Sequence, residues 1–173
     1  MSLSSSQVTL HRPGTLEDFN FTLLFGTWFV MWTTFPMWRD KKSVTITYEP
    51  LGHNMFSSDV AHSKGGPPTH IRGVEKLTDK SGARFEWHGK MFLRLVHSKW
   101  EVLGMGEEDG LEWCVISFQK SIFTPAGCDL LARPKDGANP SEETRTKVLN
   151  IITAKLENIP GFAKMAESGF LVQ

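Results

Sequence analysis

The chain has 173 residues, a length that suits one domain with a core large enough to need no disulfide or metal. Its 19 basic residues balance its 19 acidic residues, so no net field favours nucleic acid, an anionic membrane or an acidic substrate. Apolar residues make up 40% of the chain and include 12 Phe and 6 Trp, without an apolar run long enough for a transmembrane helix. We therefore expect a small, neutral or weakly charged hydrophobic partner, no nucleic acid and no membrane; the composition indicates no oligomeric state.

A short N-terminal helix is the first predicted element. Thr15 can cap it, acidic residues follow in the first turn, and Gly26 ends it. Residues 1–14 are predicted to form a flexible N-terminus, and residues 15–173 a single domain.

The first residues also bear on location. Met1 to Ser6 are small and polar, without the basic and apolar stretches of a secretory signal. We therefore expect a cytoplasmic protein, in which Cys114 and Cys128 are free thiols, with a disulfide between them as the alternative.

A series of short strands follows Gly26. Apolar and polar residues alternate there with period two, which is typical of half-buried β-strands. Pro, Gly, Asn and Asp residues separate the runs at short intervals, as in an antiparallel meander. The eight predicted strands are 27–35, 43–49, 54–63, 69–77, 83–88, 91–97, 99–105 and 111–120.

The last part of the chain is predicted to be a connector and a helix. Residues 121–140 are rich in Pro and Gly and should wrap along the surface. Ser141 can cap a helix over 141–159, which Pro160 ends. Its apolar stripe should pack against the sheet and consists of Val148, Ile151, Ile152 and Leu156.

The arrangement around Gly26-Thr27-Trp28 resembles the lipocalin or calycin family. The resemblance implies a mainly β fold: an eight-stranded antiparallel up-and-down barrel, with a short N-terminal helix and a C-terminal helix packed outside. In that family the tryptophan plugs the closed end of the barrel, and a later arginine covers it. Lys120 and Arg133 are the candidates for that position here. Segments 98–104 and 123–129 are also similar to fungal lipocalin-like proteins associated with natural-product biosynthesis.

Strand parity, counted from Trp28, predicts an aromatic barrel interior. An eight-stranded barrel has room for a solid core or for one small ligand. Several tryptophans are hard to bury completely, which favours the ligand pocket. The expected ligand-binding residues are Trp32, Tyr48, Trp87, Leu95, Trp100 and Trp113.

His97 and Asp59 are the candidate catalytic residues. His97 is the polar member of a predicted inward row, where it could protonate or bind a ligand oxygen, or simply be a hydrogen-bonded core or rim residue. Asp59 and His62 have opposite parity on one strand, so only one of them should face inward. An inward Asp59 would have a raised pKa and could transfer protons, whereas a surface Asp59 would do neither.

No metal and no cofactor are expected. The six histidines form no His-x-His pair on one strand face and no Cys/His group with zinc-site spacing. The chain lacks a glycine-rich nucleotide loop and a Gly-x-Ser-x-Gly elbow. Haem is the alternative that the sequence leaves open, because a barrel histidine such as His97 could be an axial ligand.

These observations favour a cofactor-independent enzyme. Cyclisation or isomerisation of a hydrophobic metabolite, by a pericyclase such as a Diels-Alderase of secondary metabolism, needs shape and water exclusion more than a catalytic motif. The alternatives are a non-catalytic carrier of a hydrophobic small molecule, and an acid/base dehydratase that uses Asp59 or His97.

Overall fold

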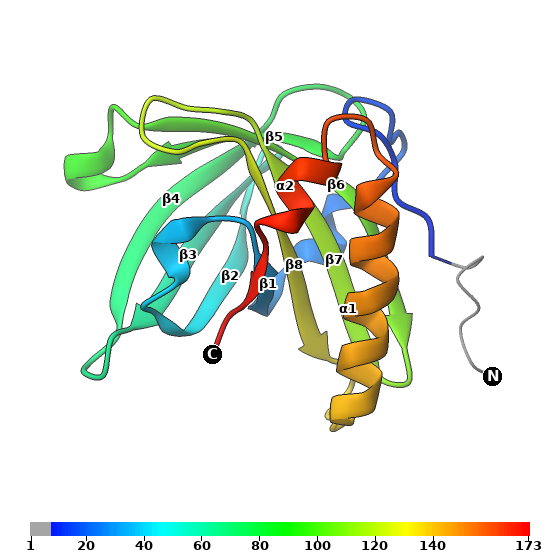
Figure 1. The fold of residues 1–173 in the computed structure, drawn as a ribbon. Coiled ribbons are helices and arrows are strands. Elements are labelled where there is room, and N and C mark those ends of the chain that lie inside the picture. Colours follow the sequence, from blue (N-terminus) through cyan, green and yellow to red (C-terminus); the bar gives the residue numbers. More distant parts are fainter. Residues whose placement is uncertain (1–7) are drawn as a thin grey trace.

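One antiparallel sheet closes on itself in the computed structural model, which describes residues 8–173 (Figure 1). Strands β1 to β8 pair in chain order, and β1 pairs with both β2 and β8, which makes an eight-stranded up-and-down barrel. The strands of the described chain are β1 (Gly26–Thr33), β2 (Lys42–Gly52), β3 (Met55–Ser63), β4 (Thr69–Leu77), β5 (Arg84–Gly89), β6 (His97–Glu108), β7 (Leu111–Phe118), β8 (Gly127–Pro134) and β9 (Phe170–Leu171).

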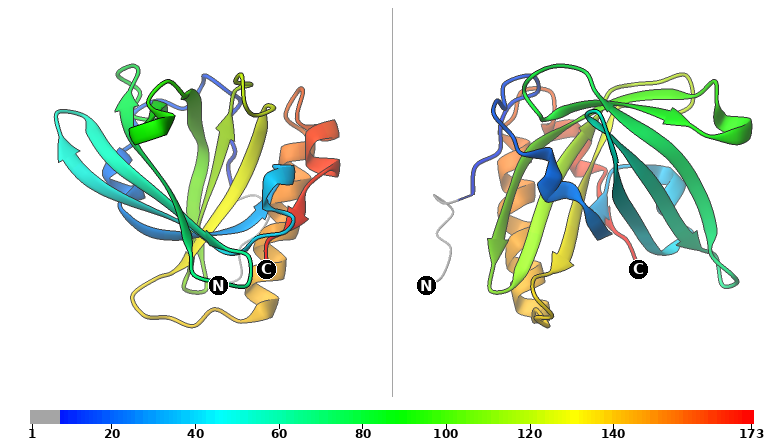
Figure 2. Two further views of the ribbon diagram at one scale, coloured as in Figure 1. Left: turned by 90° about the vertical axis from the view of Figure 1, so that its left-hand side faces the viewer. Right: turned by 180° about the vertical axis from the view of Figure 1, so that it is seen from behind.

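Helices lie outside the barrel or at its ends. The C-terminal helix α1 (Glu142–Glu157) runs along the outer wall and is followed by α2 (Ala163–Glu167), as Figures 1 and 2 show. Ser141 caps α1 as predicted, because its Oγ accepts a hydrogen bond from the Thr144 amide at 3.1 Å. Residues 8–173 also contain three single 3-10 turns, η1 (Phe21–Leu24), η2 (Pro36–Trp38) and η3 (Met91–Leu93). Among the described residues, no helix has the length and apolar character that a membrane crossing requires.

The N-terminal helix is shorter than predicted. It is the single turn η1, and its cap is Asn20 instead of Thr15, since the Asn20 side chain accepts from the Thr22 amide. Of the expected flexible segment 1–14, residues 1–7 lie outside the described residues. Residues 8–14 run along β6, where the His11 amide donates to the Leu103 carbonyl at 2.7 Å.

Two strand predictions were wrong. Residues 91–96 form η3 and a loop, not a strand, and His97 begins β6; Met91 has a positive φ of 55°, and its side chain is exposed. Residues 127–134, predicted as part of a surface connector, form β8, which pairs with β1 and β7. The run Cys128 to Ala132 is buried on both faces, so it shows no alternation, and flanking Pro and Gly residues disguise it as a loop.

Trp28 plugs one end of the barrel, as the resemblance implies. Its side chain is fully buried, and its Nε1 donates to the Leu24 carbonyl at 2.8 Å. Arg133, one of the two candidates, covers it with the guanidinium 3.9 Å from the ring centroid. The same guanidinium donates to the Phe25 carbonyl at 2.7 Å, so it joins β8 to the end of η1.

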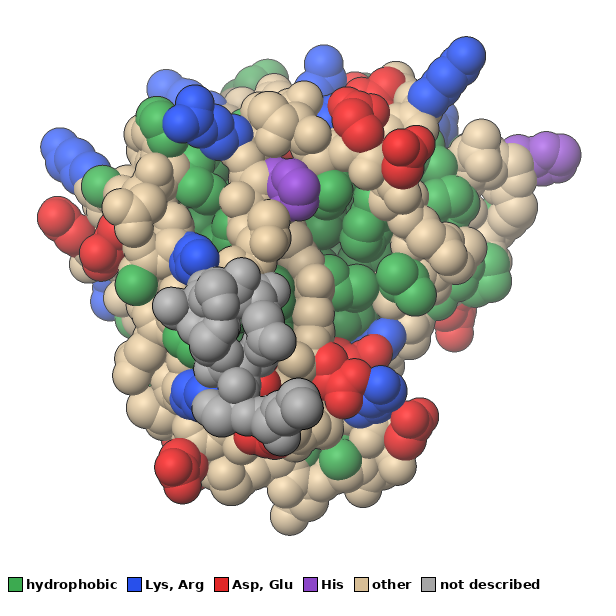
Figure 3. All heavy atoms as spheres, turned by 90° about the vertical axis from the view of Figure 1, so that its right-hand side faces the viewer, with side chains coloured by type: hydrophobic (Ala, Val, Ile, Leu, Met, Phe, Trp, Pro, Cys, Tyr) green, Lys and Arg blue, Asp and Glu red, His purple; other side chains and the backbone are tan. Residues whose placement is uncertain are grey.

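A second apolar layer lies between α1 and the outer face of the sheet. The predicted stripe of α1 packs there, with Val148, Ile152 and Leu156 buried against side chains of β1, β6, β7 and β8. The face that carries α1 shows basic and acidic side chains interspersed, with hydrophobic ones between them (Figure 3). Beneath α1 the inner face of the sheet packs in the barrel core and the outer face packs against the helix, so both faces are buried there.

Candidate functional site

The barrel contains a cavity of about 170 Å³ at the end where β1 finishes, away from Trp28. A void of about 150 Å³ holds a benzene molecule, so this one accommodates a small ring or the end of a longer chain. Its walls come from every strand of the barrel and from the loops after β1, β5 and β7. Apolar and aromatic side chains predominate, and the lining includes Val30, Phe35, Trp38, Ile46, Tyr48, Val60, Ile71, Trp87, Val96, Trp100 and Phe118.

Stacked aromatic rings form a continuous wall of the cavity. The Trp100 ring lies 6.0 Å from Tyr48 at an interplanar angle of 15° and 6.0 Å from Phe118 at 26°. Phe118 in turn meets Phe35 edge to face, with ring centroids 5.4 Å apart. These contacts hold the rings in place before any ligand arrives, which lowers the entropic cost of binding.

Glu75 on β4 is a buried carboxyl in this apolar cavity. Its Oε2 accepts a hydrogen bond from Trp100 Nε1 at 2.7 Å, and Ser58 is a second hydrogen-bond partner. Burial disfavours the charged form and raises the pKa of Glu75 to about 7, although the bonds with Trp100 and Ser58 pull the pKa down. At neutral pH the carboxyl is therefore divided between its neutral and ionised forms.

Asp129 on β8 is a second buried carboxyl of the cavity wall. Its Oδ1 accepts a hydrogen bond from Thr33 Oγ1 at 2.6 Å, and that hydroxyl oxygen accepts from the Phe35 amide at 3.0 Å. Burial raises the pKa of Asp129 to about 7, and the Thr33 bond opposes that rise.

Tyr48 is a buried phenol in the wall of the same cavity. Burial is the largest cause that raises the pKa of Tyr48 well above its usual value, and the charges of Glu75 and Asp129 raise it further. The phenol therefore stays neutral. The cavity can thus offer a neutral hydrogen-bond donor and a group that releases or takes up a proton near neutral pH.

Three of the predicted ligand-binding residues, Tyr48, Trp87 and Trp100, line the cavity. The predicted inward positions of Trp32, Trp113 and Leu95 were wrong. Trp32 and Trp113 lie in the layer beneath α1, and Leu95 is 84% exposed in the loop after β5.

The predicted positions of Trp32 and Trp113 are wrong for two different physical reasons. A β-bulge between Val30 and Trp32 shifts the register of β1 against β8, so Trp32 turns to the outer face although Trp28 and Val30 face inward. In β7 both faces are buried, so a large ring such as Trp113 can occupy either one, and the inner residue next to it is Cys114.

The predicted catalytic residues lie away from the cavity. The His97 side chain is 50% exposed, and its neighbours Val96 and Ser98 line the cavity instead. Asp59 lies on the outer side of β3, where His70 Nδ1 is 2.9 Å and Arg72 Nε 3.0 Å from its carboxylate. Partial burial acts to raise the pKa of Asp59, but the hydrogen bonds with His70 and Arg72 outweigh it and lower the pKa, which is the opposite of an inward acid.

Sequence reasoning missed Glu75 and Asp129. Glu75 has the same parity on β4 as the inward Ile71, so counting along that strand could have found it. Asp129 lies in the segment predicted as a connector, to which strand parity does not apply.

Among residues 8–173, the one group of side chains suited to a metal ion lies on the outer face of β5 and β6, not in the cavity lining. Cys114 and Cys128 are free, as predicted, and both are buried, which raises the pKa of each thiol.

Solved structures share this architecture. Insecticyanin from the tobacco hornworm Manduca sexta is 14% identical, with 95% of this chain and 87% of that chain covered at a TM-score of 0.64. The siderocalin Ex-FABP, described as functioning through dual ligand specificities, is 12% identical, with 80% of this chain and 90% of that chain covered at a TM-score of 0.50. No known protein family and no curated protein matches the sequence. The barrel closed by β1 and the helix on its outer wall therefore give this chain the lipocalin fold.

Proposed function

We propose that the protein binds a small, largely apolar molecule in the barrel cavity and catalyses its cyclisation or isomerisation without a cofactor. The observation that carries this proposal is the pair of buried carboxyls, Glu75 and Asp129, in the wall of an otherwise aromatic cavity. The pKa of each carboxyl is about 7. General acids and bases are most effective when their pKa lies near the working pH, so both carboxyls suit catalysis at neutral pH.

Isomerisation follows directly from these groups. The ionised carboxyl takes a proton from a carbon next to a ligand carbonyl, and the other, neutral carboxyl donates a hydrogen bond to the carbonyl oxygen. If the ligand has a carbon-carbon double bond beside that carbon, return of the proton to the far end of the double bond moves the double bond along the chain. Both carboxyls are buried among apolar side chains, and the low local polarity strengthens both interactions.

Cyclisation uses the same cavity differently. Stacked walls that hold a flexible substrate in a reactive conformation lower the barrier, and a hydrogen bond from a neutral carboxyl activates a carbonyl. With the fungal resemblance expected from segments 98–104 and 123–129, we propose that the ligand is a specialised metabolite, closed by a pericyclic step of the Diels-Alder type. The volume of about 170 Å³ suits the reacting end of such a molecule.

A carrier of hydrophobic molecules is the second candidate, because apolar and aromatic walls alone suffice for binding. Acid/base dehydration is a variant of the first proposal, with Glu75 and Asp129 in place of the expected Asp59 and His97.

A simple proton-transfer substrate separates enzyme from carrier. Ring opening of 5-nitrobenzisoxazole requires only the removal of one proton from carbon, and the molecule is small, flat and apolar. We expect the protein to accelerate this reaction, with the Glu75→Gln or Asp129→Asn variant at least tenfold slower. The Asp59→Asn variant, which removes an outer carboxyl, is the matched control and should keep the wild-type rate.

Binding is measured in parallel with the fluorescent apolar probe N-phenyl-1-naphthylamine. Binding without acceleration would reject the acid/base proposal and favour the carrier. An absence of both binding and acceleration would reject the cavity as a ligand site.

A further inference from the structure

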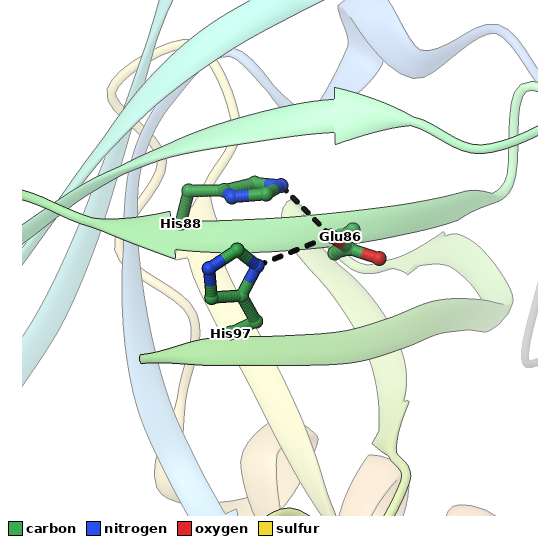
Figure 4. A group of neighbouring side chains, drawn as sticks. All are labelled: Glu86, His88 and His97. Carbon is green, nitrogen blue, oxygen red and sulfur yellow. Dashed lines mark hydrogen bonds and ion pairs between the residues drawn. The ribbon is translucent and has the colours of Figure 1, made fainter. Parts of the chain in front are cut away.

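Glu86, His88 and His97 form a cluster on the outer face of the barrel (Figure 4). Glu86 and His88 are two residues apart on β5, so their side chains point to the same face. His97 on β6 pairs directly with His88. The Gly89 amide donates to the Val96 carbonyl, which makes His88 and His97 a non-hydrogen-bonded pair, the arrangement that brings opposite side chains closest.

The three side chains converge on one point between the strands. His88 Nε2 lies 2.9 Å and His97 Nδ1 lies 3.4 Å from Glu86 Oε1, and the ring centroids are 4.2 Å apart. All three ligand atoms lie within 4.8 Å of one another. Tetrahedral zinc with ligands at about 2.0 to 2.2 Å separates neighbouring ligand atoms by about 3.3 to 3.6 Å. Small side-chain rotations are therefore enough to reach that geometry.

We propose that Glu86, His88 and His97 bind a divalent transition-metal ion such as Zn²⁺. Two imidazole nitrogens and one carboxylate oxygen are a ligand set that zinc accepts, with solvent as the fourth ligand. The side chains are 27%, 26% and 50% exposed, so solvent and the ion both have access to the site. The proposal is independent of the proposed function, because the cluster lies outside the cavity.

Nearby charges set the expected strength of the site. Lys76 on β4 and Lys99 on β6 both pair with Glu86, so they flank its carboxylate. Their positive charges disfavour a second cation nearby. We therefore expect binding weaker than in structural zinc sites and sensitive to ionic strength.

The site would join β5 to β6 at the cavity wall. Trp87, between Glu86 and His88, faces the cavity, as do Val96 and Ser98 on either side of His97. A bound ion would therefore hold together two strands whose inner side chains line the ligand site.

The test is a titration of the complete, untagged protein with ZnCl₂ by isothermal calorimetry, supported by the visible absorption spectrum with Co²⁺. We expect one ion per chain, a tetrahedral Co²⁺ spectrum, and affinity at least tenfold lower in the His88→Gln and Glu86→Gln variants. The matched control is His53→Asn, which changes an exposed histidine at a positive φ of 53° that Asn also adopts; it should bind like the wild type.

Circular dichroism confirms that each variant is folded before the titration. No saturable binding by the wild type, or equal affinity in the wild type and the folded His88→Gln variant, would overturn the proposal.

Discussion

Replacement of Glu75 by glutamine should stabilise the protein at alkaline pH and leave it nearly unchanged at acidic pH. The glutamine would keep the shape of the side chain and an oxygen that accepts from Trp100 Nε1, but it cannot ionise. The buried charge of Glu75 is then removed without a cavity. The effect on the free energy of unfolding follows from the difference between the pKa in the folded and unfolded states.

The sign and size can be worked out from the pKa of Glu75, which is 4.5 in the unfolded chain and about 7 in the folded protein. Below pH 4.5 both states are protonated, and the group contributes no pH dependence. Between these values folding takes up a proton, so stability falls as the pH rises, and it levels off above the folded pKa. The full loss is about 3 kcal/mol, of which about 2 to 3 kcal/mol falls between pH 5 and pH 8.

The assay is urea unfolding of the wild type and the Glu75→Gln variant at pH 5 and pH 8, followed by tryptophan fluorescence. We expect the variant to gain about 2 to 3 kcal/mol over the wild type between the two pH values. Glu49→Gln, which changes an exposed glutamate on β2, should show no such difference. Equal pH dependence in the Glu75→Gln variant and the wild type would show that Glu75 is not a buried acid with a raised pKa.

Three further changes test the barrel and its cavity. Trp28→Ala should lower the free energy of unfolding by about 3 to 5 kcal/mol, because the plug is fully buried; an unchanged urea midpoint would contradict its role. Arg133→Met should cost about 2 kcal/mol in the same assay, since it removes the contact with Trp28 and the bond to the Phe25 carbonyl, and no change would contradict that contribution. Trp100→Ala should weaken the binding of N-phenyl-1-naphthylamine at least tenfold, whereas Trp113→Ala should destabilise the protein but keep the probe affinity; the reverse pattern would place the ligand site beneath α1.

Parity predicted the interior correctly where only one face of the sheet is buried. On β2 and β5, Tyr48 and Trp87 face inward, while neighbours such as Thr47 and Glu86 lie on the other face. Where α1 covers the outer wall, both faces are apolar and alternation disappears, so the pattern predicts neither the outward position of Trp113 nor strand β8. The bulge in β1, which reorients Trp32, has no signal in hydrophobicity.

The cluster of Glu86, His88 and His97 on the outer face also could not be predicted from the sequence pattern. A search for His-x-His along one strand cannot find Glu86, His88 and His97, because His97 joins the group across strands. That pairing depends on the register of β5 and β6, which the loop at residues 90–96 sets. Because the sequence pattern predicts a separate strand at residues 91–97, it does not predict the register of β5 and β6 that pairs His97 with His88.

The two buried carboxyls are unfavourable for stability, and this bears on what the cavity is for. Ionisation of Glu75 and Asp129 costs about 3 and about 4 kcal/mol at alkaline pH, by the difference between a pKa of about 7 and the unfolded values of 4.5 and 3.8. A domain of this size is stable by only about 5 to 15 kcal/mol, so the cost is a large part of the total. Glutamine and asparagine would remove it at nearly constant volume. Local features that oppose stability are expected at functional sites, where the chemistry requires them. The position of both carboxyls in the wall of one cavity therefore fits the proton-transfer role that we propose, and the rates of the Glu75→Gln and Asp129→Asn variants test it.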